Sequence, residues 1–360
     1  MVPRQFDTDV VVVGGGPAGS ATAIACAERG LPVRLFERDM FTGDRPGETF
    51  HPGIEPVLGQ LGVGDRLSAV IGARHEGTWI EWGGGRRFEG FGSDASGPWR
   101  GFQVSRAGFD TMLLARAREL GVAVQQPCAV REVLLDGDRV AGVVTRDWSV
   151  STRLLVDASG RSHWLARALG VARARCSPRL VARYGYAGGS CPARDDAPAL
   201  VGDASGWLWT AMVRPGVYQW TRVGPDGSRL AAEWLPEEFR ALTPLGRPRG
   251  ADVTWRIANQ VARAGWFMVG DAAAVLDPTS SHGALKALMS GITAGHLIAA
   301  VLHRNASAMA AADAYRDWLV RWFARDVAAL SRFYRELGIQ GFAEDNPAAR
   351  IAPRPPKPID

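Results

Sequence analysis

A glycine-rich turn close to the N-terminus constrains the fold more than any other feature of this 360-residue sequence. Gly14, Gly16 and Gly19 give the pattern G-x-G-x-x-G, with an apolar stretch before it and a helix-like stretch after it. In this pattern the first glycine permits a tight turn, the second lets the backbone approach a pyrophosphate, and the third lets the helix pack close to the sheet. The N-terminus of the helix then offers free N–H groups and a partial positive charge to phosphates. We therefore expect a strand over 9–13, a helix over 17–29 and a dinucleotide site between them.

Glu37 completes this βαβ unit at the end of a second apolar strand, which we expect over 33–37. A carboxylate in that place can accept hydrogen bonds from the hydroxyls of a ribose. Nothing in this segment distinguishes FAD from NAD. The residues expected to bind the nucleotide are Gly14, Gly15, Gly16, Ala18, Gly19, Glu37 and Arg38.

The rest of the pattern divides the chain into interleaved parts. Helical patterns occupy 54–70, 107–120, 281–301 and 309–337, a strand is expected over 266–269, and hairpins over 78–88 and 207–222. Because dinucleotide-type pieces lie at both ends with a β-rich piece between them, the fold class is α/β: a Rossmann-type domain with an interleaved antiparallel β domain and C-terminal helices. We predict a discontinuous nucleotide domain (1–75, 100–178 and 256–300), a β-rich substrate domain (76–99 and 179–255), a C-terminal helical segment (301–340) and a mobile tail (341–360).

Four later segments resemble the group A flavin monooxygenases, a family whose branch also contains the flavin-dependent halogenases. The resemblance covers about residues 7–340 and implies the group A fold with FAD as cofactor. In the family, the arginine reaches the FAD phosphates, the aspartate of the G-D segment contacts the ribityl chain, and a helix N-terminus faces the isoalloxazine ring, where its dipole stabilises negative charge. The matching residues are Arg106, Asp157 and Gly160, Gly270 and Asp271, and then Pro278, Ser281 and Gly283.

Residues 47–53 and 270–291 are most similar to a narrower set, the maturation flavoproteins encoded with lysine-oxidase and glycine-oxidase-type quinoproteins. Those proteins oxygenate a tryptophan of a partner protein during cysteine tryptophylquinone biogenesis. The resemblance implies an FAD-dependent monooxygenase that uses O2 and an external reductant, NAD(P)H or a flavin reductase. Its aromatic substrate would be a tryptophan of a partner quinoprotein precursor rather than free tryptophan.

Two histidines and three tryptophans are the candidate catalytic and substrate residues. His51 and His282 lie in the two most family-like loops, and histidine is a common acid/base group, although a lone histidine is more often structural. Trp207, Trp209 and Trp220 are expected to line an aromatic substrate pocket on the β-rich domain, with core packing as the alternative.

Several alternative functions stay open: a small-molecule aromatic hydroxylase, a flavin halogenase, an isoprenoid double-bond reductase that needs no O2, and a non-catalytic FAD-containing escort. The halogenase hypothesis meets two departures. Trp207 and Trp209 match the halogenase motif W-x-W-x-I-P, but the Ile-Pro is missing. Neither lysine, Lys286 or Lys357, lies in the N-terminal third, where halogenases carry the lysine beside the substrate. An arginine does not replace it, because a guanidinium does not readily give up a proton. We therefore expect no halide incorporation.

Composition limits the partners, the location and the metals that we expect for the protein. The net charge is +5, but the basic residues are scattered, which argues against a nucleic-acid partner. No long uninterrupted apolar stretch and no N-terminal signal core are evident, so we expect no membrane span and a cytoplasmic location. The four cysteines lack the spacing of a zinc site, and we expect no metal.

Overall fold

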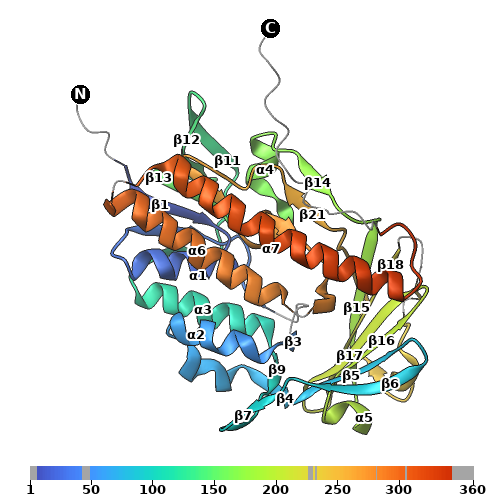
Figure 1. Ribbon diagram of the computed structural model, residues 1–360. Coiled ribbons are helices and arrows are strands. Elements are labelled where there is room, and N and C mark those ends of the chain that lie inside the picture. Colours follow the sequence, from blue (N-terminus) through green and yellow to red (C-terminus); the bar gives the residue numbers. More distant parts are fainter. Residues whose placement is uncertain are drawn as a thin grey trace, which may run out of the picture.

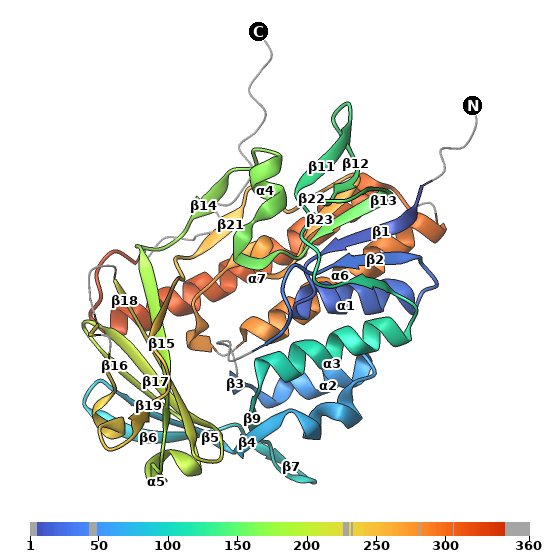
Figure 2. The same ribbon diagram turned by 180° about the vertical axis from the view of Figure 1, so that it is seen from behind.

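A computed structural model describes residues 6–42, 49–225, 230–231, 233–280, 282–304 and 306–342. Two large sheets dominate it, and helices cover the first of them (Figures 1 and 2). The expected Ser281 contact, and all of the predicted tail beyond residue 342, lie outside the described residues.

The first sheet contains the expected βαβ unit. Its parallel strands are apolar and fully buried at the centre, as a sheet covered on its faces requires. The order along the sheet is β10 (Ala123–Gln125), β2 (Val33–Phe36), β1 (Thr8–Val13), β13 (Ser149–Asp157), β12 (Arg139–Val144) and β11 (Glu132–Asp136). Two further strands join beside β13: β23 (Trp266–Met268), which is parallel to it, and β22 (Ala262–Arg263).

Four long helices pack on or beside this sheet. Helix α1 follows the glycine turn and contacts both α3 and α6 (Figure 1). Helix α6 is long and apolar enough to cross a membrane by length and composition alone, but it packs on α1 so closely that a Cβ at Gly291 would lie 2.2 Å from the Ala18 carbonyl oxygen. That packing is typical of a core helix. The helices are α1 (Pro17–Ala27), α3 (Arg106–Glu119), α6 (Gly283–Arg304) and α7 (Ala308–Glu336), with the shorter α2 (Glu55–Gln60), α4 (Trp164–Ala168) and α5 (Pro192–Asp195).

The second sheet is the expected β-rich layer. Its two longest hairpin strands, β17 and β18, pair antiparallel around Pro215 and Gly216, as the alternating aromatic pattern predicts. The order is β19 (Thr243–Pro244), β15 (Leu180–Gly188), β18 (Val217–Pro225), β17 (Gly206–Arg214), β16 (Ala199–Asp203), β5 (Gly77–Trp82) and β6 (Gly85–Gly90), with β20 (Arg249–Asp252) also on β15. Its strands come from two separate stretches of the chain.

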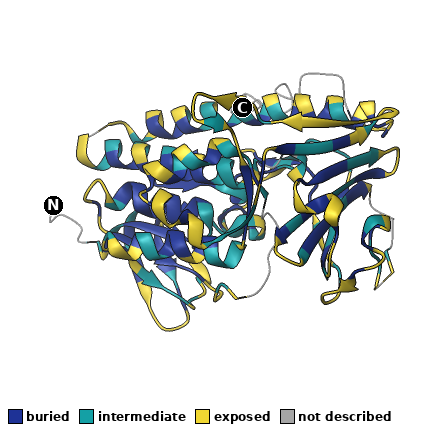
Figure 3. Ribbon diagram, turned by 90° about the horizontal axis from the view of Figure 1, so that it is seen from below, coloured by how far each residue is buried: buried dark blue, intermediate teal, exposed yellow. Residues whose placement is uncertain are grey.

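Small sheets connect the two layers. One contains β3 (Thr49–Phe50), β9 (Gly101–Val104) and β4 (Ile71–His75), and another contains β14 (Arg173–Arg175), β21 (Arg256–Ala258) and β24 (Ala274–Val275). A two-stranded piece, β7 (Ser93–Asp94) with β8 (Gly97–Pro98), lies beside the first. Helix α7 runs past both large sheets, and its outward face is exposed while its inner face is buried (Figures 1 and 3).

Two expectations about elements are wrong in part. The helix expected over 54–70 ends at Gln60, because Gly62 adopts a left-handed φ of +70° and a 3-10 turn over Gly64–Ala69 follows. The mobile end expected from residue 341 starts too early, since Phe342 is buried and its ring stacks on Tyr334 at 4.3 Å.

Candidate active site

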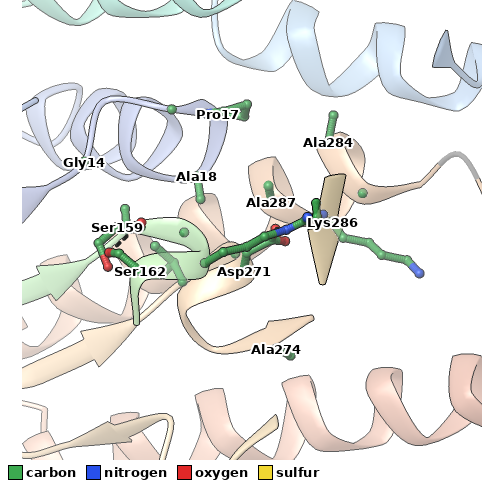
Figure 4. A pocket seen from close by; sticks show the side chains of 18 of the residues that line it. Gly14, Pro17, Ala18, Ser159, Ser162, Asp271, Ala274, Ala284, Lys286 and Ala287 are labelled. Atoms are coloured by element: carbon green, nitrogen blue, oxygen red, sulfur yellow. Dashed lines mark hydrogen bonds and ion pairs between the residues drawn. The ribbon is translucent and has the colours of Figure 1, made fainter. Parts of the chain in front are cut away.

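One cavity of about 620 Å³ extends from the glycine turn to the second sheet. Residues of α1, the loop after β13 and the start of α6 converge on it (Figure 4). Predicted cofactor residues that line it are Gly14, Gly16, Ala18, Glu37, Arg38, Arg106, Gly160, Gly270, Asp271, Pro278 and Gly283, and predicted substrate residues that line it are Trp207 and Trp209. The cavity therefore brings together residues from both ends of the chain and from the β-rich middle.

The glycine turn has the geometry that a pyrophosphate needs. Gly14 adopts a φ of +108°, and a Cβ there would lie 2.3 Å from the Ala158 carbonyl oxygen. A Cβ at Gly19 would lie 1.9 Å from the Gly14 carbonyl oxygen, so the helix can approach the turn only with glycine there. In contrast, a Cβ at Gly16 would meet no atom within 4 Å, and this open side faces the cavity. No side chain caps the N-terminus of α1 at Gly16, which leaves N–H groups for a phosphate.

Glu37 and Arg106 lie along the nucleotide end of the cavity. The buried Glu37 carboxylate accepts hydrogen bonds from Gly15 N (2.7 Å) and Asp39 N (2.8 Å), which ties the end of β2 to the glycine turn. Arg106, at the start of α3, contacts the buried Asp110 carboxylate, with Nη2 3.2 Å from Oδ1. The ion pair holds the guanidinium in the cavity wall. These groups fit the ribose and phosphates of FAD.

Asp157 was expected to contact the cofactor, but it does not line the cavity. It is fully buried, and its two oxygens accept hydrogen bonds from Ser159 N and Leu165 N, both at 2.9 Å. Burial raises the pKa of this carboxyl, while those hydrogen bonds lower it. Asp157 therefore shapes the loop that presents Gly160 to the cavity, rather than contacting a ligand itself.

The flavin-facing end of the cavity is built from the loop after β23 and from α6. Asp271 pairs with Arg161, whose Nε lies 3.3 Å from Oδ2, and both residues line the cavity. Lys286, one turn into α6, also lines it (Figure 4). Its ammonium pairs with Asp326 of α7 and lies 4.4 Å from the centre of the Trp322 ring. Burial lowers the pKa of Lys286, and Asp326 opposes that shift.

His51 and His282 lie together but outside the cavity wall. Their ring centres are 5.3 Å apart, and His51 Nδ1 accepts a hydrogen bond from Gly53 N. Burial lowers the pKa of both rings, that of His282 to about 4. A third histidine, His75, is close by: it packs against Phe91, which also contacts His51. The two candidate acid/base residues are thus neighbours of the site, and their role in catalysis stays a prediction.

The placement of the tryptophans differs from the expectation at one position. Trp207 and Trp209 line the cavity, but Trp220 does not. Trp209 pairs across the hairpin with Thr221, so that Trp220, one residue away, points to the opposite face. There it packs in a separate apolar cluster against Trp234, with ring centres 4.8 Å apart. Trp220 is a core residue of the second sheet.

Several cavity residues escaped the sequence patterns. Helix α7 contributes Trp318 and Trp322, whose spacing of four residues places them on one helix face. The spacing predicts that the two tryptophans share one helix face, but it does not predict that this face lines the cavity. Tyr184, Gln219 and Thr221 on the second sheet also line the cavity without having been singled out. Lys286 was expected on the flavin-facing helix, but not as a residue of the site.

Residues 7–183 match the sequence family described as FAD binding domain. The match spans β1, the glycine turn, Glu37, Arg106 and the Asp157–Gly160 loop, which form the nucleotide end of the cavity. The chain is an FAD-dependent oxidoreductase. Its FAD-binding domain is of the kind found in the group A flavoprotein monooxygenases and flavin halogenases.

Known relatives of this oxidoreductase are similar over most of its length. It is 28% identical to a tryptophan 2-halogenase of Chondromyces crocatus, over 91% of this chain and 68% of the relative. It is 29% identical to a 1H-pyrrole-2-carbonyl-(peptidyl-carrier protein) brominase of Pseudoalteromonas luteoviolacea, over 86% of this chain and 81% of the relative. The solved structure of a myxobacterial chondrochloren halogenase superposes with a TM-score of 0.83 at 27% identity, over 91% of this chain and 82% of the other.

These relatives correct the narrower resemblance. All three are named as halogenases, and none is a maturation flavoprotein of a quinoprotein. The group A fold and the FAD cofactor are confirmed, whereas a quinoprotein partner gains no support from these comparisons.

Proposed function

We propose that this oxidoreductase modifies an electron-rich aromatic ring with O2, and that halogenation of the ring is the reaction it performs. The observation that carries the proposal is the single cavity in which the FAD-binding turn and an aromatic floor, Trp207 and Trp209, meet. FAD, when bound and reduced by the external reductant, would supply the two electrons that activate O2. In halogenation a halide replaces a ring hydrogen and both oxygen atoms leave as water. In hydroxylation one oxygen atom stays on the ring and the other leaves as water.

The protein's own contribution is to orient the ring and keep the site dry. Trp207 and Trp209 offer flat, apolar surfaces for an aromatic substrate. Trp318 and Trp322 of α7 add two further aromatic rings to the cavity wall, which limits the access of water to the reacting atoms. The N-terminus of α6 at Gly283 would stabilise negative charge at the flavin-facing end.

Lys286 supports halogenation over hydroxylation. No lysine lies at the position where halogenases carry theirs, yet the cavity wall contains an ammonium group from a different element. Asp326 and Trp322 hold this cation in place, so it can attract and orient an anionic or strongly polarised halogen species. The names of the relatives favour the same reaction.

Hydroxylation is the second candidate, because one departure from the halogenases stands. Ala211 and Met212, not Ile-Pro, stand at the fifth and sixth positions of the motif that begins with Trp207-Leu208-Trp209 on β17. Either reaction can take a ring that is carried on a protein, and one relative is named for a pyrrole on a carrier protein. A tryptophan of a quinoprotein precursor belongs to the same substrate class.

The test is the mass of the product. Holoprotein, a flavin reductase, NADH and O2 are mixed with free tryptophan, indole, a carrier-bound pyrrole or a tryptophan-containing precursor, with and without bromide. Halogenation predicts a brominated ring only when bromide is present. A gain of one oxygen atom that is independent of bromide would replace halogenation by hydroxylation. Product formation without O2 would instead indicate a reductase.

A further inference from the structure

A buried hydrogen bond joins the aromatic floor of the cavity to the last turn of α7. Trp207 Nε1 donates to the Tyr334 hydroxyl at 2.9 Å, and the two side chains are 3% and 0% exposed. Trp207 lines the cavity, whereas Tyr334 lies behind it. Because the indole N–H has a single direction, this bond fixes the plane that Trp207 presents to a substrate.

Residues packed around Tyr334 also hold the Asp277–Thr279 turn at the flavin-facing end of the cavity. The carboxylate of Asp277, which lines the cavity, accepts hydrogen bonds from Trp255 Nε1 (2.8 Å) and Thr279 N (3.0 Å). The Trp255 ring packs edge-on against Tyr334, with ring centres 5.6 Å apart, and Phe342 stacks on Tyr334. Trp207 and Asp277, on two different parts of the cavity wall, are therefore both held by the cluster around Tyr334.

Helix α7 is anchored at both ends by a tyrosine hydroxyl. Near its start, the fully buried Tyr315 donates to the carbonyl oxygen of Met268 on the first sheet, at 2.8 Å. Near its end, Tyr334 accepts from Trp207 on the second sheet, and the next turn packs so closely that a Cβ at Gly202 would lie 2.5 Å from Leu337 Cδ2. The helix thus spans the two sheets between which a substrate must lie.

We propose that Tyr334 is a positioning residue, which fixes Trp207 on the aromatic floor relative to the Asp277–Thr279 turn at the flavin-facing end. The inference rests on the proposed function in one respect, namely that Trp207 contacts the substrate. Tyr334 does not line the cavity and acts through the two cavity residues to which its hydroxyl is hydrogen-bonded, Trp207 and Asp277. A ring held loosely by 1 Å or so can cost about a hundredfold in the rate of a reaction that depends on alignment.

Tyr334→Phe tests this with the packing of the ring preserved. The variant should bind FAD as tightly as the wild type, within about twofold, because no group of the nucleotide end changes. The modified product formed per NADH consumed should fall by about tenfold, the equivalent of one net buried hydrogen bond. Tyr315→Phe is the matched control: it removes a buried hydroxyl from the same helix and should leave the yield per NADH unchanged. An unchanged yield in Tyr334→Phe, or an equal loss in Tyr315→Phe, would overturn the proposal.

A second variant and a second measurement keep the test independent of folding and of turnover. Trp207→Phe removes the same hydrogen bond from the other side, and the double variant should lose less than the product of the two single losses. The visible circular dichroism of bound FAD, with and without indole, should change in Tyr334→Phe and not in Tyr315→Phe. This readout works even if the wild type modifies no ring, which would refute the proposed function alone. Additive losses in the cycle, or identical spectra in both tyrosine variants, would contradict the positioning role.

Discussion

Gly16 is the residue at which the cofactor site depends most on the absence of a side chain. Its Cβ would enter open space on the cavity side, where the pyrophosphate of FAD must approach the backbone. Gly16→Val should therefore abolish FAD binding, measured as the ratio of flavin absorbance to protein. Gly59→Val is the matched control, since a Cβ there also meets no atom within 4 Å but lies outside the cavity wall. Normal flavin content in Gly16→Val would disprove the placement of the phosphates.

His75 makes the stability of the protein depend on pH. Burial lowers its pKa from 6.5 to about 4, and the nearby His51 adds to that shift, while the Gly77 carbonyl opposes it. Between those pH values the unfolded chain binds more protons than the folded one, so stability falls as the pH falls. The contribution, up to about 3 kcal/mol, is fully present above pH 6.5 and lost on acidification through pH 4.

Urea unfolding at pH 7.5 and pH 5 measures this effect. His75→Gln should reduce the loss of stability between the two pH values. A residual loss should remain from the other histidines whose pKa burial lowers, among them His282, to about 4, and His163. His303→Gln, at an exposed histidine near the end of α6, should keep the wild-type difference. An identical pH dependence in His75→Gln and wild type would contradict this assignment.

Lys286 gives α6 a role in the proposed halogenation, in addition to its place at the flavin-facing end of the cavity. If its ammonium orients the halogen species, Lys286→Met should lower the halogenated product about a hundredfold, with the FAD content unchanged. Lys286→Arg should also lower the product, because a planar guanidinium with a fixed fork of donors does not place its charge where the compact ammonium lies. Arg325→Met, at a cation that is 79% exposed, should behave as the wild type. Full halogenation by Lys286→Met would remove the lysine from the reaction.

The hairpin of β17 and β18 illustrates how far sequence patterns reach. Alternation along each strand places Trp207 with Trp209 correctly, because neighbouring side chains of a strand alternate between faces. The face of Trp220 depends on the cross-strand register, and the register shifts at a bulge between Met212 and Arg214. A register shift of one residue exchanges the two faces of a strand, and no local sequence pattern predicts the shift at this bulge.

The nucleotide end was the most predictable part of the site, because its chemistry lies within one continuous turn. Gly14, Gly19 and Glu37 all have the geometry that the motif implies. Trp318 and Trp322, in contrast, reach the cavity only because α7 packs across it. Their positions depend on tertiary contacts between segments that no spacing rule connects.

The whole molecule should unfold as one unit, because α7 contacts both large sheets through Tyr315 and Tyr334. FAD binds the first sheet and should then stabilise both, by about 2.7 kcal/mol when free FAD is a hundred times its Kd. Far-ultraviolet circular dichroism and tryptophan fluorescence should give one coincident transition with and without FAD. Two separate transitions, of which FAD moves only the first, would show that α7 does not couple the sheets.

A single turnover tests the central claim, that one cavity joins the FAD site to an aromatic-binding floor. Holoprotein is reduced without O2, then mixed with O2, bromide and a panel of free and protein-borne indole, pyrrole and phenol rings. The modified ring is counted by mass spectrometry for each bound flavin. We predict an O2-dependent modified product approaching one per flavin with at least one ring class. Complete reoxidation of the flavin with no modified ring in any class would contradict the account.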